Sequence, residues 1–129
     1  MQFDLRVLGA VSAGGVIGAL ARFALSTAWP HEVGDFPWAT WVINVTGCFL
    51  LGMLMALIAR RWPAQRYLRP FLGTGVLGGY TTFSAWAVET LQSRPWVALA
   101  YGGATVAGAL LAAWAGGAVA AGGAVGRTR

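Results

Sequence analysis

Long apolar stretches alternate with short polar connectors along this chain. The stretches span about residues 5–28, 38–59, 67–91 and 96–121. Each has roughly the 20 residues that a helix needs to cross a bilayer. Tryptophan and tyrosine residues lie near the ends of the stretches, as in the aromatic belts of membrane proteins. The pattern predicts an all-α membrane protein with four transmembrane helices in a single domain, residues 1–129.

Composition supports this fold class and excludes several functions. The 129 residues are 57% hydrophobic and only 10% charged, whereas a soluble domain carries about a quarter charged residues. All nine cationic residues are arginines, which excludes the lysine of a P-loop or of a Schiff base. One cysteine and one histidine exclude a zinc site of protein ligands. No paired acid and base or activated nucleophile is evident, so we expect no enzyme activity.

The first stretch has a competing interpretation as a cleaved signal peptide, but Arg22 and a high density of glycine interrupt its apolar block.

The arginines predict an orientation in the membrane. With the N-terminus inside, seven arginines lie inside: Arg6, Arg60, Arg61, Arg66, Arg69, Arg127 and Arg129. Arg22 and Arg94 fall toward the outside. This bias follows the positive-inside rule, and arginines at the ends of spans do not indicate nucleic-acid binding.

Two polar residues lie within the first two stretches. Arg22 shares a helix face with Gly14 and Gly18, and it either faces a watery cavity or extends to the membrane interface. Asn44 lies in the second stretch, where an amide facing lipid would remain without hydrogen-bond partners. Asn44 therefore faces protein or water, either as an interhelical hydrogen bond or within a functional site.

The third stretch is the least typical of a simple span. Gly78 and Gly79 fall at mid-membrane depth, where each glycine costs a helix about 1 kcal/mol relative to alanine. The pair predicts two half-helices joined by unwound backbone, which membranes tolerate only inside protein or along a cavity. The free carbonyls of such a break suit a small cation, and the N-termini of half-helices favour an anion. A continuous helix with a glycine packing notch is the alternative.

Uncharged hydrogen-bond donors recur at membrane depth. They are Asn44, Thr81, Thr82, Ser84, Thr105 and the Trp86 indole. Phe83 and Trp86 are three residues apart and share a face, so they present electropositive ring edges together. Tyr101 and Thr105 extend a polar stripe along the fourth stretch, although Thr105 could also bond its own helix. Donors and ring edges of this kind suit a channel for a small, strongly hydrated anion.

Three sequence blocks carry a resemblance to a known family. They are GGVIGALARF at 14–23, TWVINVTG at 40–47 followed by FLLG at 49–52, and GGYTTFS at 78–84 with Glu89. In this order they resemble the Fluc (CrcB) fluoride channel family over essentially the whole chain. The resemblance implies a four-span subunit that forms an antiparallel dimer in the inner membrane of a prokaryote. Its two pores would export fluoride passively and relieve fluoride toxicity.

The resemblance also implies roles for single residues. A central sodium ion would be held by the backbone carbonyls of Gly78 and Thr81. Arg22 would lie near the vestibule and raise the local anion concentration, and Glu89 would have a structural role. The fluoride pore would comprise Asn44, Thr82, Phe83, Ser84, Trp86, Tyr101 and Thr105.

The chain departs from the family pattern in three respects. Trp86 stands where the second of two pore phenylalanines is expected, and Ala109 stands where the polar track would have a hydroxyl. The arginine bias of seven to two is large for a homodimer of opposed subunits. We therefore expect either a second copy of the chain or a related, oppositely inserted chain as the partner, in contact with membrane lipid.

Two other functions stay open at the level of sequence. A small dual-topology exporter of cations or drugs needs a carboxylate in the membrane, for which Glu89 is the candidate. A non-transporting assembly subunit would explain the glycines but not the polar line from Asn44 to Thr81 and Thr82.

Overall fold

Helices cover all four apolar stretches of the chain. A computed structural model describes residues 4–122, which include the helices α1 (Leu5–Ala28), α2 (Trp38–Arg61), η1 (Arg69–Leu77), α3 (Gly78–Tyr80), α4 (Phe83–Gln92) and α5 (Pro95–Gly122). Three of them, α1, α2 and α5, are long and apolar enough to cross a membrane. The third stretch is divided among η1, α3 and α4. Arg127 and Arg129 of the predicted charge bias lie outside the described residues.

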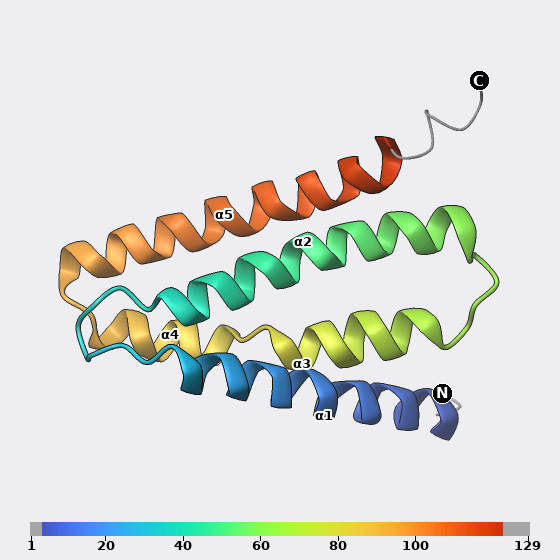
Figure 1. Ribbon diagram of the computed structural model, residues 1–129, viewed down its shortest axis with the longest axis horizontal. Helices are drawn as coiled ribbons and strands as arrows, with labels where there is room; N and C mark the ends of the chain where they lie inside the picture. The colour runs from blue at the N-terminus through green and yellow to red at the C-terminus, as the bar shows by residue number, and fades with distance from the viewer. Residues whose placement is uncertain (1–3, 123–129) are drawn as a thin grey trace.

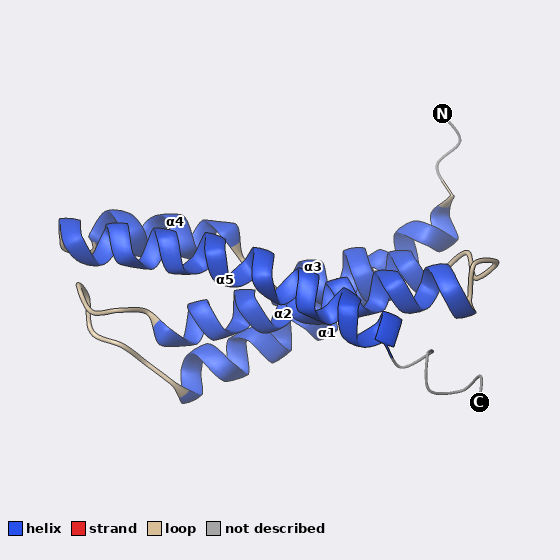
Figure 2. Ribbon diagram, turned by 90° about the horizontal axis from the view of Figure 1, so that it is seen from above, coloured by secondary structure: helices blue, strands red, loops and turns tan. Residues whose placement is uncertain are grey.

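The helices pack in two pairs. α1 lies along η1 and α3, and α2 lies along α5 (Figure 1). Seen from above, α4 and the start of α5 lie to one side of the end of α1 and the start of α2 (Figure 2). The helices converge toward the middle of the molecule, which is where the third stretch is interrupted.

Glycines allow the backbones within each pair to approach closely. A Cβ atom on Gly14 or Gly18 of α1 would collide with backbone atoms of η1, including the carbonyl oxygens of Phe71 and Val76. In the second pair, a Cβ on Gly52 would meet the carbonyl of Ala113. Small residues at such spacing are the usual means of association for membrane helices, since lipid tails leave no hydrophobic driving force between them.

The break in the third stretch lies three residues beyond its predicted position. Gly78 and Gly79 are helical, and the extended residues are Thr81 (φ −75°, ψ 157°) and Thr82 (φ −147°, ψ 121°). Gly79 remains helical because its bare face packs against the backbone of Gly15. The glycine pair is thus a packing notch beside a real break, so each of the two alternatives was half right.

The first half of the broken segment is a π-helix, which the sequence pattern does not predict. η1 runs for nine residues from Arg69, and Pro70 lies in its first turn, where a helix needs no N–H donor. π-Helical turns are rare and occur frequently at functional sites. The wider winding ends at Leu77, and only the short helix α3 separates it from the break.

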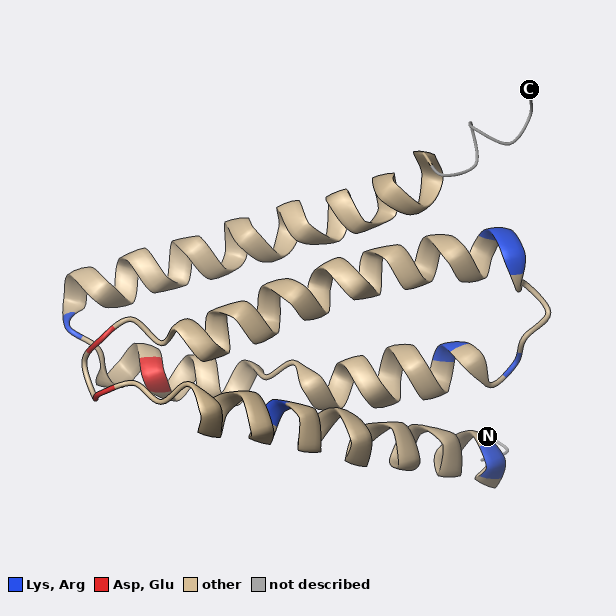
Figure 3. Ribbon diagram, viewed as in Figure 1, with Lys and Arg blue, Asp and Glu red and all other residues tan. Residues whose placement is uncertain are grey.

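Five of the seven arginines among the described residues lie at one end of the molecule. Arg6, Arg60, Arg61, Arg66 and Arg69 lie at the end that holds the start of α1 and the connector after α2. Glu32, Asp35 and Arg94 lie in the connectors of the opposite end (Figure 3). At the arginine end, Arg66 pairs with Asp4 at 2.8 Å, and Arg60 donates to the carbonyls of Ala120 and Ala121. The arginines therefore also secure the ends of α1 and α5.

We predict that Gly18→Ala destabilises the chain by about 1–3 kcal/mol, because the added methyl overpacks the contact with η1. Its matched control is Gly15→Ala on the same helix, where a Cβ meets nothing within 4 Å and alanine improves helix propensity. Unfolding in mixed detergent micelles by increasing fractions of dodecyl sulfate measures both. Equal midpoints for the two variants would contradict the backbone contact.

Candidate functional site

Asn44 holds the backbone of the break. Its Oδ1 accepts the Thr82 N–H at 2.8 Å, and its Nδ2 donates to the Thr82 carbonyl at 3.0 Å. The amide side chain therefore takes the place of a neighbouring peptide group. In a continuous helix the Thr82 N–H would bond the carbonyl of Gly78 instead. Both Asn44 and Thr82 are buried, so without this pair two backbone groups would be left without partners.

The threonines of the break are held on both sides. Thr81 donates its hydroxyl to the Leu77 carbonyl at 2.9 Å, which closes the end of α3. The Thr82 hydroxyl accepts the N–H of Ala85 at 3.2 Å and caps the start of α4. Local side-chain bonds of this kind compete with helix continuation and are typical of threonine at helix ends.

Arg22 reaches the break from α1. Its Nη1 donates to the Thr81 carbonyl at 3.2 Å, and the residue is only partly exposed. Of the two sequence interpretations, the geometry corresponds to a side chain that faces protein and a cavity. A positive charge therefore lies beside the unwound backbone.

One cavity of about 440 Å³ borders the break, and we name it the break cavity. Its wall is formed by residues of α2, the broken segment and α5, namely Asn44, Gly47, Cys48, Leu51, Gly73, Leu77, Gly78, Thr81, Thr82, Phe83, Trp86, Thr105, Val106, Ala109 and Leu110. None of these side chains is charged. The Phe83 and Trp86 rings lie 5.2 Å apart with their planes tilted by 43°. The cavity thus combines polar side chains with aromatic rings.

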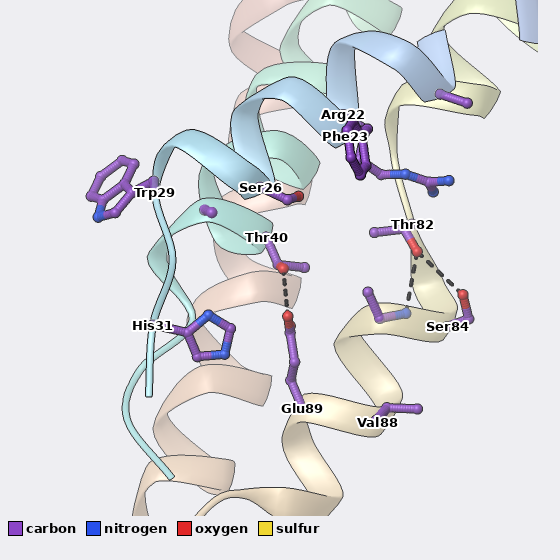
Figure 4. A pocket seen from close by; sticks show the side chains of 13 residues that line it. Arg22, Phe23, Ser26, Trp29, His31, Thr40, Thr82, Ser84, Val88 and Glu89 are labelled. Carbon is purple, nitrogen blue, oxygen red and sulfur yellow. Dashed lines mark hydrogen bonds between the residues drawn. The ribbon is translucent and has the colours of Figure 1, made fainter. Parts of the chain in front are cut away.

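A second cavity of about 700 Å³ also borders Thr82, and we name it the arginine cavity. Arg22, Thr40, Ser84 and Glu89 line it together with apolar residues (Figure 4). Thr82 belongs to the walls of both cavities. The two spaces are therefore neighbours at the break.

Comparison with known proteins supplies the family. The family model described as CrcB-like protein, Camphor Resistance (CrcB), matches residues 9–117. The chain belongs to the CrcB family.

Three relatives of the chain are named as fluoride-specific ion channels. FluC 2 of Nocardia farcinica is 50% identical over 88% of this chain and 81% of its own length. FluC 2 of Streptomyces avermitilis is 48% identical over 78% of this chain and 66% of its own length. FluC 1 of Streptomyces coelicolor is 46% identical over 84% of this chain and 73% of its own length.

Most residues predicted for the pore of this CrcB chain lie together. The break cavity brings together five of them, namely Asn44, Thr82, Phe83, Trp86 and Thr105. Gly78 and Thr81, which the resemblance assigns to sodium, line the same cavity. Arg22 and Ser84 line the arginine cavity instead. Thr105 does not bond its own helix, since its hydroxyl has no partner among the described residues.

Tyr101 lines neither cavity. It is fully buried, and its hydroxyl donates to Glu89 Oε2 at 2.7 Å. Thr40 donates to the other carboxylate oxygen of Glu89 at 2.7 Å (Figure 4). The carboxylate thus joins α4 to α2 and α5, which corresponds to the structural role that the CrcB resemblance implies for Glu89.

Sequence reasoning missed Thr40 and His31 as residues of the site. Thr40 lies one helical turn before Asn44, so the helical spacing was a usable signal for a second polar residue on the same face. His31 lies in the connector between α1 and α2 and reaches the arginine cavity only through the tertiary fold (Figure 4). No local pattern indicates its position.

We predict that Asn44→Ala loosens the break. Each backbone group of Thr82 left buried without a partner costs about 1–3 kcal/mol, so amide hydrogen exchange at Thr82 becomes faster. Mass spectrometry of the peptide that contains Thr82 measures the exchange. Thr90→Val is the control, because the Thr90 hydroxyl bonds only the Trp86 carbonyl of its own helix. Unchanged exchange at Thr82 in Asn44→Ala would refute the role of the amide.

Proposed function

We propose that this chain is a subunit of a fluoride-selective channel that exports fluoride passively across the inner membrane of a bacterium. The observation that carries the proposal is the break cavity, where uncharged polar side chains and aromatic rings gather around unwound backbone in the middle of an apolar stretch. The relatives named as fluoride-specific ion channels support the choice of ion.

The break cavity replaces the water that a small anion loses. Asn44 uses one of its two N–H groups on the Thr82 carbonyl, and the other is available to an anion. The ring edge of Phe83 adds a weaker electropositive contact. Several contacts of moderate strength admit the ion and also release it, which is the general requirement for conduction.

The arginine cavity serves as the entrance to this site. Arg22 places a fixed positive charge at its wall, and a charge in a cleft with low-dielectric walls raises the local concentration of anions. The single acid of this cavity, Glu89, accepts two hydroxyl bonds that spread its charge. Ser84 and Thr82 then provide hydroxyls, with their oxygens 3.3 Å apart, on the way to the break cavity.

The membrane potential suffices to drive export. Hydrogen fluoride is neutral and crosses membranes, ionises inside and leaves the anion trapped. A potential that is negative inside favours exit of the anion by about 2.3 kcal/mol per charge per 100 mV. A passive pore therefore needs no nucleotide and no coupled ion.

The residues assigned to sodium fit a cation site shared between two subunits. In a continuous helix the Thr82 N–H would bond the Gly78 carbonyl, but here it bonds Asn44 instead. The Gly78 carbonyl therefore does not receive this bond, and Gly78 is exposed. The Thr81 carbonyl accepts from Arg22 and keeps one lone pair. Two such oxygens from each chain would hold the ion, which when bound supplies a fixed positive charge at the centre of the assembly.

A second, oppositely inserted subunit would complete the pore. Phe83 is 76% exposed and Leu110 68% exposed, although both belong to the wall of the break cavity. Polar atoms of that wall are costly against lipid, so a protein surface is the better cover. The arginine-rich end favours one orientation of this chain. A related chain is therefore the partner that we favour, and Streptomyces avermitilis has relatives named FluC 2 and FluC 3.

We predict that liposomes containing the purified assembly release fluoride and retain chloride. Asn44→Ala and Phe83→Ala lower fluoride efflux about tenfold, because each removes a contact to a charged ion. A fluoride electrode records the efflux after valinomycin opens a path for potassium. Val33→Ala is the control, since this exposed connector residue lines neither cavity. Vesicles that keep their fluoride with the wild-type chain, alone and with a related subunit, would refute the channel.

We predict that the chain inserts in one orientation. In a Cys48→Ser background, Val33→Cys and Gln65→Cys place single thiols in connectors at opposite ends. An impermeant maleimide added to intact cells labels position 33, and it labels position 65 only after permeabilisation. Equal labelling of both positions in intact cells would instead support a homodimer of opposed copies.

A further inference from the structure

A third cavity lies at the arginine-rich end of the molecule, and we name it the connector pocket. It has a volume of about 410 Å³ and lies between the end of α2, the connector that follows and the start of η1. Its wall combines apolar side chains, including Met55, Ile58 and Pro70, with the two arginines Arg66 and Arg69. It shares no lining residue with the break cavity or the arginine cavity, so none of the roles proposed above uses it.

The positive charge of the connector pocket is only partly compensated. Arg66 forms an ion pair with Asp4, with 2.8 Å between Nη2 and Oδ2, and its side chain remains 68% exposed. Arg69 is exposed, and its side chain has no hydrogen-bond or ion-pair partner among residues 4–122. No acidic residue lines the pocket within the part of the chain that the structure describes. A guanidinium has five N–H donors, so both arginines retain donors for a negatively charged ligand.

The connector pocket lies at the level where the chain leaves the second apolar stretch. α2 ends at Arg61, and the connector that follows holds the exposed rings of Trp62 and Tyr67. Aromatic residues at the ends of spans mark the headgroup level of a membrane. The apolar wall supplied by α2 therefore lies on the hydrocarbon side of the pocket, and the arginines lie at the level of the lipid phosphates.

We propose that the connector pocket binds an anionic phospholipid, with its phosphate on Arg66 and Arg69 and the start of an acyl chain against Met55 and Ile58. The planar fork of arginine matches the oxygens of a phosphate and forms charge-assisted hydrogen bonds with them. Basic pockets between membrane helices on the cytoplasmic side bind anionic headgroups. The orientation predicted for this chain places the arginine-rich end on that side. The inference goes beyond fluoride conduction and does not depend on it.

A lipid fits the connector pocket better than a soluble phosphate does. The wall presents apolar and cationic side chains together, and a phospholipid is an amphiphile that contacts both kinds. A soluble phosphate would contact the arginines and gain nothing from Met55, Ile58 or Pro70. A bound lipid would also contact the end of α2 and the start of η1 at once, so it would join the second span to the broken third stretch.

Native mass spectrometry tests the site on the purified assembly, with its partner subunit if one is required. The protein in a nonionic detergent is titrated with dioleoylphosphatidylglycerol or dioleoylphosphatidylcholine, which have the same acyl chains but differ in net charge. Each arginine at the membrane surface adds about fivefold to the affinity for an anionic lipid. Because Asp4 already engages Arg66, we expect phosphatidylglycerol to bind about tenfold more tightly than phosphatidylcholine.

The decisive variant is Arg69→Gln, which removes a charge from the pocket without removing a contact among the described residues. It should weaken phosphatidylglycerol about fivefold and leave phosphatidylcholine unchanged. Arg61→Gln is the matched control, because it removes the same charge from the same end but outside the pocket. Arg94→Gln is a second control at the opposite end. Equal losses in Arg61→Gln and Arg69→Gln would overturn the site and indicate a diffuse surface potential only.

Asp4→Asn tests the contribution of Arg66. Asparagine caps a helix as well as aspartate does, so α1 keeps its N-cap while the ion pair is lost. The released guanidinium should raise the affinity for phosphatidylglycerol about two- to threefold. An unchanged affinity would contradict binding by two arginines.

A soluble headgroup separates the two sources of phosphate. Glycerol 3-phosphate at a concentration equal to that of phosphatidylglycerol should leave the bound lipid in place, because it lacks the acyl chains. Its displacement of the lipid would overturn the lipid site and identify a site for free phosphate. Equal binding of phosphatidylglycerol and phosphatidylcholine would also overturn the proposal, and it would indicate that detergent or another protein segment covers the pocket.

Discussion

The pairing of the Asn44 amide with the backbone of Thr82 is the interaction on which the rest of the structure depends. An interrupted helix leaves peptide groups without their helical partners, and hydrocarbon supplies no replacement. Asn44 satisfies both groups of Thr82 from the neighbouring helix. The break can therefore persist at membrane depth, and two cavities form beside it.

Close backbone packing supports this arrangement from the opposite side. Gly14, Gly18 and Gly79 let α1 approach η1 and α3 so closely that side chains would not fit. That approach brings Arg22 within reach of Thr81. The geometry of the break is thus set by a polar contact from α2 and by apolar packing against α1.

The four stretches that become helices could be predicted because their length and apolarity are properties of local sequence. The residues of the break cavity followed from polar side chains in apolar surroundings, which is why Asn44 and Thr82 were found. The position of the break was missed, since Gly78 and Gly79 are helical through contacts with a distant segment. The hydrogen bond from the Tyr101 hydroxyl to Glu89 was also not predicted, since it joins residues on two different helices.

Arg22 combines a hydrogen bond to the break and a positive charge beside a cavity at one position. Its guanidinium occupies a carbonyl that the interrupted helix leaves exposed, and the same charge sets the electric field of the adjoining space. A neutral residue in place of Arg22 would lose both the hydrogen bond and the charge. Lysine would keep the charge but not the planar geometry of the guanidinium. In the channel that we propose, the architecture of the break and the affinity for anions would therefore both depend on this one side chain.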